Sequence, residues 1–299
     1  MTGSLLVVGD VVTDVVALHP EPLAPATDTP ARIRTLPGGA GANAACWAAH
    51  AGVAEVALLA RVGADSAAWH EAALRRAGVR PRLVVDPQEP TGTVVSLVDA
   101  AAERTFLTDS GAALRLSPAD WSDGLLDGVA HVHLSGYLFF AVPSRDLARL
   151  VLRAARDRGV PVSVDPASAG FLRTAGPERF LDDVAGAGIL LPNEAEAALL
   201  AGQPAGAAPA EAAAALSRRV PLVVVTQGAA GALVAEGGAV TARVPGAPAP
   251  AAVDSTGAGD AFTGGFLAAR LAGAAPAAAA AAGCRAGAAA VSRTGGRPA

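Results

Sequence analysis

Residues 254–266 read DSTGAGDAFTGGF, a stretch in which glycines, small hydroxyl residues and aspartates open an apolar helix. Gly257 and Gly259 permit backbone conformations with positive φ, and Gly257-Ala258-Gly259 places several amide N–H groups at the helix start. A helix N-terminus carries roughly half a positive charge and about four unbonded N–H donors. This stretch therefore predicts a site that binds an anion such as phosphate.

Asp260 follows this glycine triplet directly. A carboxylate in the first turn of a helix often only complements the helix dipole. Beside an anion hole it can instead take a proton from an attacking hydroxyl, while the amides hold the oxygens of a moving phosphoryl group. The stretch is not a P-loop, because no Gly-Lys-Ser/Thr follows, and it lacks the spacing of a dinucleotide site.

Composition limits the class of protein further. Hydrophobic residues make up 52% of the 299 residues and charged residues 17%, which predicts a compact protein. The net charge of −4 without a basic patch argues against nucleic-acid binding. Cys46 and Cys284 have no paired spacing, so we expect two buried thiols in a reducing compartment.

Two apolar tracts are expected to belong to the fold and not to a membrane. The first, MTGSLLVVGDVVTDVV, lacks a basic region and carries Asp10 and Asp14, so it predicts a strand and no signal peptide. The second, residues 271–291, is mostly alanine and contains Pro276 and Arg285, which predicts a buried helix. We expect a cytoplasmic protein.

Short β-rich runs alternate with longer helical patterns along most of the chain. This alternation predicts an α/β fold, a Rossmann-like, doubly wound and mostly parallel sheet covered on both faces. Residues 11–36 and 92–108 break the rhythm with paired strand-like runs and no helix between them. They predict a small β-sheet lid inserted into a single domain that spans residues 1–299.

In open parallel sheets, ligands bind beyond the carboxyl ends of the strands. Asp14, Asp165, Asn193 and Thr226 follow predicted strands and are therefore expected at that edge. In the strand HVHLSG we expect His131 and His133 to lie on opposite faces and to be structural.

Two glycine-rich stretches resemble one known family. DSTGAGDAFTGGF resembles the C-terminal signature of the ribokinase-like (PfkB-type) carbohydrate kinases, and PGGAGANAACWAAHAG, residues 37–52, resembles their N-terminal signature. The resemblance implies a Rossmann-like domain with a β-lid and the ATP-dependent phosphorylation of a hydroxymethyl group. It also implies a homodimer, since this family commonly dimerises through its lid and exposed strand edges tend to be paired.

The resemblance assigns roles to individual residues. Asp260 matches the catalytic base, with Gly257, Ala258 and Gly259 as the anion hole. PNEAE, residues 192–196, is similar to the N-x-x-E motif, which places Asn193 and Glu196 near Mg²⁺ and the phosphates, where oxygen ligands suit the ion. The remaining matches are Thr226 and Gly228 for ATP, Asp254 and Thr256 for a monovalent cation such as K⁺, and Asp14, Gly38, Gly39 and Asn43 for the acceptor.

The sequence also departs from the ribokinases proper. Val12 stands where they usually carry asparagine, Ala40 stands where they carry lysine, and Tyr137 replaces an expected acidic contact. These changes predict a more apolar acceptor pocket, in which Tyr137, Phe139 and Phe140 pack on a ring or belong to the core. A small sugar, a nucleoside of the adenosine or pseudouridine type, and a silent ligand-binding protein of the same fold stay open as alternatives.

Overall fold

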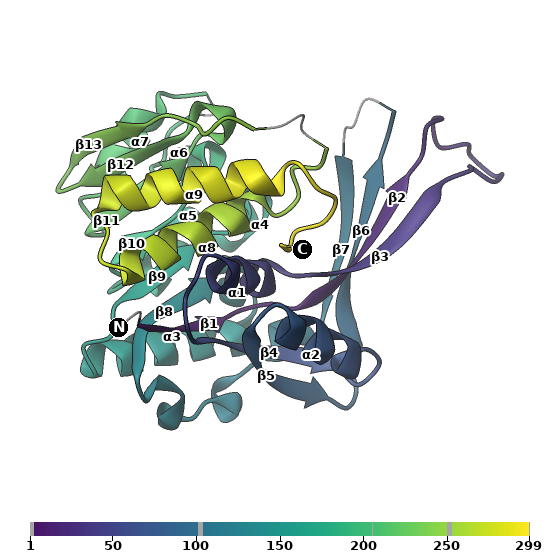
Figure 1. Cartoon of the computed structure of the whole chain (residues 1–299), viewed down its shortest axis with the longest axis horizontal. Helices are drawn as coiled ribbons and strands as arrows, with labels where there is room; N and C mark the ends of the chain where they lie inside the picture. The colour runs from purple at the N-terminus through teal and green to yellow at the C-terminus, as the bar shows by residue number, and fades with distance from the viewer. Residues whose placement is uncertain (1–2, 101–103, 205, 250–252, 299) are drawn as a thin grey trace.

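The computed structural model describes residues 3–100, 104–204, 206–249 and 253–298 (Figure 1). Its main body is a nine-stranded sheet with strand order β13-β12-β11-β10-β9-β8-β1-β4-β5. The pairings from β5 to β11 are parallel, and β12 and β13 add an antiparallel edge. The strands of this sheet are β1 Ser4–Val8, β4 Val56–Gly63, β5 Val79–Asp86, β8 Val129–Ser135, β9 Val162–Asp165, β10 Ile189–Leu190, β11 Leu222–Thr226, β12 Ala232–Glu236 and β13 Ala239–Val244.

Helices cover both faces of this sheet, and strand side chains alternate between the two cores. Leu5 and Val7 of β1 pack in the core under one set of helices, and Leu6 and Val8 pack in the opposite core. The first set comprises α1 Ala40–His50, α2 Ala67–Arg76, α8 Ala258–Leu271 and α9 Pro276–Ala290. The second comprises α3 Val142–Asp157, α4 Ala169–Ala175, α5 Pro177–Asp183, α6 Glu194–Leu200 and α7 Pro209–Leu216. The predicted fold class is confirmed.

A second sheet of four strands forms the lid, which projects from one side of the main body (Figure 1). Its strands are β2 Val12–Leu18, β3 Arg32–Gly38, β6 Thr91–Val98 and β7 Arg104–Gly111. The central strands β2 and β6 are parallel, and β3 and β7 pair with them in the antiparallel sense. These strands begin and end within a few residues of the two predicted lid segments.

Cross-strand register divides the lid into two faces. Asp14 pairs with Val94, and Val94 pairs with Thr108, so these side chains share the face that turns toward the main body. Ile33 and Leu107 belong to the outer face, where they are 64% and 58% exposed. The inner face of the lid therefore covers a cavity, and its outer face exposes large apolar side chains.

The prediction that His131 and His133 lie on opposite faces was wrong. Residues i and i+2 of a strand point to the same face, and the rings of both His131 and His133 lie 2.9 Å from the Ser163 hydroxyl. Burial lowers their pKa values to about 4 and about 3, so both stay neutral at physiological pH. A structural role for both histidines fits this burial.

The two cysteines, Cys46 and Cys284, are free and buried, as expected. The alanine-rich tract 271–291 contains α9, which packs against α8 in the core. Within the described ranges, no helix has the length and apolar character that a membrane crossing requires.

Candidate active site

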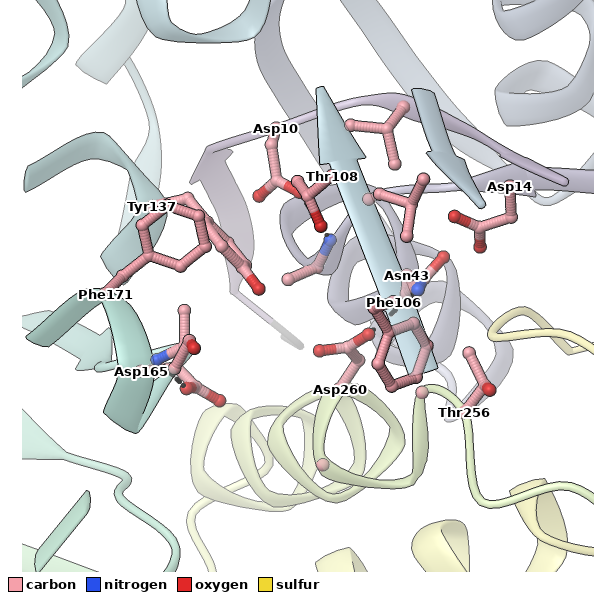
Figure 2. A pocket seen from close by; sticks show the side chains of 18 of the residues that line it. Asp10, Asp14, Asn43, Phe106, Thr108, Tyr137, Asp165, Phe171, Thr256 and Asp260 are labelled. Atoms are coloured by element: carbon pink, nitrogen blue, oxygen red, sulfur yellow. Dashed lines mark hydrogen bonds between the residues drawn. The ribbon is translucent and has the colours of Figure 1, made fainter. Parts of the chain in front are cut away.

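A cavity of about 720 Å³ lies between the carboxyl ends of the parallel strands and the inner face of the lid. Side chains reach it from different layers of the fold: Asp14 and Phe106 from the lid, Asn43 from α1, and Asp260 from α8 (Figure 2). Most of the predicted site residues line this one cavity, namely Asp14, Gly39, Asn43, Asn193, Glu196, Thr226, Thr256, Gly257, Gly259 and Asp260.

Helix α8 begins at a glycine that no other residue can replace without strain. Gly257 has φ of +74°, and a Cβ on it would lie 2.4 Å from the Cα of Gly296. Asp260 stands in the first turn that follows, and its side chain points up from the helix into the cavity (Figure 2). The Nδ2 of Asn43 donates a hydrogen bond of 2.8 Å to Oδ2 of Asp260.

The surroundings of Asp260 make its carboxylate a stronger proton acceptor than an aspartate in water. Burial raises its pKa well above the usual 3.8, and the negative charges of Asp165, Asp10 and Asp14 raise it further. The hydrogen bond from Asn43 acts in the opposite direction, because it stabilises the ionised form. A perturbed carboxylate in a cavity is what general base catalysis requires.

The three residues of the predicted anion hole have different surroundings. Gly257 and Gly259 line the cavity beside Asp260, and the space around the Cα of Gly259 is open. Ala258 is not among the lining residues, and its N–H donates to the Ser255 carbonyl at 3.3 Å. Its role in holding an anion stays a prediction.

The half of the cavity that the family resemblance assigns to the acceptor depends on two further glycines. A Cβ on Gly38 would lie 2.2 Å from Oδ2 of Asp14, and a Cβ on Gly39, whose φ is +100°, would lie 2.5 Å from the Asp10 carbonyl oxygen. Asn43 follows one turn later in α1 and is buried. Burial raises the pKa of Asp14 to about 6, and the guanidinium of Arg297 opposes this rise.

Asp10 was not among the predicted site residues, although it lines the cavity. Its carboxylate accepts hydrogen bonds from the N–H groups of Ala40 and Gly41 at 2.8 and 3.1 Å and from the Ser135 hydroxyl at 2.8 Å. Asp10 thereby fixes the start of α1. Its position just after β1 was the available signal, by the same strand-end argument that singled out Asp165.

Asp165 lines the cavity opposite the lid (Figure 2). It accepts hydrogen bonds from the Ala167 N–H at 2.9 Å and from the Thr263 hydroxyl at 3.2 Å. Burial raises its pKa to about 6. Through Thr263 it connects β9 to α8, the helix that carries Asp260.

Asn193 and Glu196 form a reciprocal cap at the start of α6. The Asn193 N–H donates to Oε2 of Glu196, and the Glu196 N–H donates to Oδ1 of Asn193, both at 2.9 Å. The pKa of Glu196 is raised to about 8. Burial is the main cause, and the nearby negative charge of Asp165 is the second. The carboxylate and amide oxygens at this edge are of the kind that Mg²⁺ prefers, so the donor set fits the ion.

The remaining predicted positions lie around the cavity. Thr226 lines it at the end of β11, whereas Gly228 is exposed at the next turn with φ of +55°. Asp254 is buried and accepts hydrogen bonds from the N–H groups of Thr256 and Gly295 at 2.8 and 2.9 Å. In the described part of the chain, no three His, Cys, Asp or Glu residues form a cluster that could hold a metal ion.

Aromatic side chains form one wall of the cavity. Tyr137 and Phe171 line it, and Phe140 stacks on Phe171 with ring centroids 5.1 Å apart. Phe106 enters from the lid (Figure 2). Phe139, by contrast, is buried in the core against Phe180.

Comparisons with known proteins identify the family of this chain. The family described as pfkB family carbohydrate kinase matches residues 2–299. A fructokinase of Klebsiella pneumoniae is 32% identical over 281 residues, 90% of this chain and 84% of its own length. A ribokinase of Haemophilus influenzae is 30% identical over 78% of this chain and 74% of its own length.

Solved structures show the same fold. An adenosine kinase from Sinorhizobium meliloti superposes with a TM-score of 0.88 at 23% identity, covering 100% of this chain and 96% of that chain. A putative ribokinase II from E. coli in complex with ATP and Mg²⁺ has a TM-score of 0.83 at 25% identity, covering 98% and 94%. By its two glycine signatures, its fold and its match over residues 2–299, the chain belongs to the pfkB family of carbohydrate kinases.

Proposed function

We propose that this kinase transfers the γ-phosphoryl group of ATP to a hydroxymethyl group of a small, uncharged sugar. The observation that carries the proposal is the position of Asp260. Its carboxylate lies at the helix start that carries the predicted anion hole, and its partner Asn43 lines the part of the cavity that is predicted to bind the acceptor.

The reaction needs one base and one charge-stabilising site, and one turn of α8 supplies both. Asp260 takes the proton of the acceptor hydroxyl while the oxygen of that hydroxyl forms a bond to the γ-phosphorus. The bond from that phosphorus to the bridging β,γ-oxygen breaks, and ADP leaves with the electron pair. The amides at Gly257 and Gly259 and the dipole of α8 stabilise the charge on the moving phosphoryl group.

The nucleotide half of the site includes Asn193, Glu196, Thr226 and Gly228. Asn193 and Glu196 would hold Mg²⁺, directly or through water, and the ion when bound neutralises part of the phosphate charge. Thr226 contacts the nucleotide at the strand end, and Gly228 permits the turn that follows. Asp254 and Thr256 are the positions for K⁺.

The charge of the cavity favours an uncharged acceptor. Carboxylates line it from several elements, namely Asp10, Asp14, Asp165, Glu196 and Asp260, and no arginine or lysine is among the described lining residues. An acceptor that already carries a carboxylate or phosphate would meet these acids, and no described lining side chain carries a positive charge to offset its own. We therefore place sugar acids and sugar phosphates below neutral sugars.

A nucleoside is the second candidate, and the aromatic wall is the observation that favours it. Tyr137 and Phe171 on the main body and Phe106 on the lid offer apolar ring faces and edges around the acceptor space. Such surfaces pack well against a purine or pyrimidine base. A free hexose or pentose makes less use of them.

We propose further that the protein is cytoplasmic and forms a homodimer through the lid. The outer lid face carries Ile33 and Leu107, which are among the most exposed large hydrophobic side chains of the described residues. A second copy of the same face would bury them by pairing two equivalent surfaces.

A screen for ADP release tests the proposal. Purified protein with MgATP is offered neutral sugars, sugar acids, sugar phosphates and nucleosides, and ADP formation is measured for each. The proposal predicts turnover with a neutral sugar, and turnover with nucleosides alone would favour the second candidate. Binding of acceptors without ADP formation across the whole panel would contradict a kinase and favour a silent binding protein.

A further inference from the structure

We propose that Arg297 is a positioning residue for the catalytic base: it fixes the side-chain amide of Asn43 in the orientation that donates to Asp260. The inference rests on the proposed role of Asp260 and adds a residue that neither glycine signature contains. It is carried by a chain of hydrogen bonds that joins residues far apart in the sequence.

The segment 292–298 brings Arg297 to the site. After α9 the chain turns back, and its end lies beside α1 and the base of the lid (Figure 1). Trp47 Nε1 of α1 donates to the Gly296 carbonyl at 2.9 Å, and the Gly295 N–H donates to Asp254 at 2.9 Å. The segment is therefore held between helix α1 and the loop that precedes α8.

Close packing leaves this segment little freedom. A Cβ on Gly296 would lie 2.3 Å from Nδ2 of Asn43, and a Cβ on Gly257 would lie 2.4 Å from the Cα of Gly296. The backbones of Gly257 and Gly296 thus approach each other closely, and Gly296 lies against the side chain of Asn43. Any displacement of the segment would change the position of Arg297 relative to α1.

The guanidinium of Arg297 makes two hydrogen bonds in this position. Nε donates to Oδ1 of Asn43 at 3.3 Å, and Nη2 donates to the Gly38 carbonyl at 2.8 Å. The planar fork of arginine makes both bonds at once, which holds the side chain in one orientation. Gly38 is also the residue against which Asp14 packs.

While Asp260 is ionised, as a base must be, the chemistry of the partners permits only one orientation of the Asn43 amide. Arginine only donates hydrogen bonds, and an ionised carboxylate only accepts them. With Oδ1 toward Arg297, Nδ2 faces Asp260 and donates at 2.8 Å. A flipped amide would direct its NH₂ toward the guanidinium and its oxygen toward the carboxylate, and both contacts would be repulsive.

Loss of Arg297 therefore removes one of the two contacts that fix this orientation. The amide of Asn43, which is buried, can then rotate, and Asp260 loses its fixed donor for part of the time. We expect turnover to fall about 10- to 100-fold, the effect of a misplaced catalytic group, while KM for ATP changes little.

The pH dependence of turnover separates positioning from general structural damage. The groups whose charges act on Asp260 are Asp165, Asp10 and Asp14, together with the Asn43 amide that lowers its pKa. With the Asn43 donor lost, the pKa of Asp260 rises, so the acidic limb of the turnover profile moves to higher pH. A variant that only loosens the fold would lower turnover without moving this limb.

The experiment compares R297Q, N43A and the double variant R297Q/N43A, using MgATP and the acceptor found in the screen. If Arg297 acts through Asn43, the double variant is no slower than N43A alone, because the two effects share one path. Additive losses, or a profile of R297Q that matches the wild type, would overturn the inference.

Two further variants serve as controls. R293Q makes the same substitution in the same part of the chain, outside the cavity lining, and should keep wild-type turnover. R297K keeps the charge without the planar fork, so it should stay closer to R297Q than to wild type. Full recovery with lysine would mean that charge alone matters, and would contradict positioning.

A variant of Asp260 distinguishes the two possible failures. If D260N retains turnover, the proposed function of the base is wrong, whatever R297Q does. If D260N loses turnover and R297Q does not, only the inference about Arg297 fails.

Discussion

Acidic side chains with raised pKa values face one another across the cavity. Asp14, Asp165, Glu196 and Asp260 all follow this pattern, and in each of them burial is the largest cause. Removing these carboxylates from water disfavours their charged forms more than their hydrogen bonds favour them. The same arrangement that prepares a base for proton transfer should therefore destabilise the fold at neutral pH.

Asp14 offers a direct test of that cost. Its pKa rises from 3.8 to about 6 on folding, so the folded state binds the proton more tightly than the unfolded state. The stabilisation that protonated Asp14 contributes is complete below about pH 4 and is lost as the pH rises through about 6. The wild type should therefore lose stability over this pH range, whereas D14N should not. We expect the difference in the free energy of unfolding, D14N minus wild type, to increase by about 1–3 kcal/mol as the pH rises from about 4 to above 6.

Urea unfolding of both proteins from pH 4 to pH 7.5 measures this difference. D28N, a change of one exposed aspartate in the loop between β2 and β3, controls for the loss of a negative charge. A D14N difference that stays constant with pH would contradict a raised pKa for Asp14.

Helix α8 shows how one glycine serves both the fold and the site. Gly257 ends the loop in a left-handed conformation, and its Cα lies against Gly296 of the segment that carries Arg297. A side chain here would push apart the loop that contains the predicted anion hole and the segment that we propose orients Asn43.

We expect G257A to lower stability by about 2–4 kcal/mol, because backbone strain and a backbone clash add. G273A is the matched control, since Gly273 at the other end of α8 has φ of +89° but open space around it. It should cost only about 1 kcal/mol from the backbone conformation. Thermal unfolding of both variants checks the prediction, and equal losses would show that the contact with Gly296 contributes nothing.

We expect the lid to contribute a side chain to acceptor binding through its inner face. Phe106 and Leu107 are neighbours on β7 with similar exposure, 52% and 58%, but only Phe106 lines the cavity. We expect F106A to raise KM for the acceptor about 10-fold or more, because a large apolar contact is lost, and to leave KM for ATP unchanged. L107A should leave both values near wild type, and equal effects of the two substitutions would contradict the assigned faces.

Some elements were predictable from the sequence and others were not, for physical reasons. Continuous apolar runs such as LLVV and LVVV indicated the buried strands β1 and β11. Strand β5 cannot be predicted in the same way, because Arg80, Pro81 and Arg82 interrupt its apolar pattern. This strand lies at the sheet edge, where proline and charge are tolerated. The short helices α4 and α5 have too few turns to show a clear period.

The same contrast holds for the site. Asp260, Asn43 and Glu196 were predicted because each belongs to a local motif. Arg297 was missed because its role depends on a contact with Asn43, 254 residues away in the sequence. No local pattern records such a contact, and the same is true of the hydrogen bond from Trp47 to Gly296.

The main sheet and the projecting lid contribute different parts of the cavity. The main sheet fixes the helix start at α8 and the strand-end residues, while the lid closes one side of the cavity with Asp14 and Phe106 (Figures 1 and 2). The inner lid face lines the cavity, where we propose that the acceptor binds, and the outer face is left with exposed apolar side chains. This division supports the proposed dimer.

A charge on the outer lid face should prevent that dimer. We expect I33D to shift the protein from dimer to monomer, because pairing would bury an unpaired carboxylate. V85D places the same charge at a half-exposed position of the edge strand β5 in the main sheet, and it should leave the assembly unchanged. Sedimentation equilibrium measures both, and a wild type that is monomeric at micromolar concentration would contradict the proposed dimer.

The most direct test of the account is the rate of phosphoryl transfer by D260N. With MgATP and the acceptor identified in the screen, single-turnover ADP formation should fall about 10²- to 10⁴-fold, while MgATP still binds with wild-type affinity. Wild-type transfer by D260N would contradict the assignment of Asp260 as the base, and with it the central claim about this cavity.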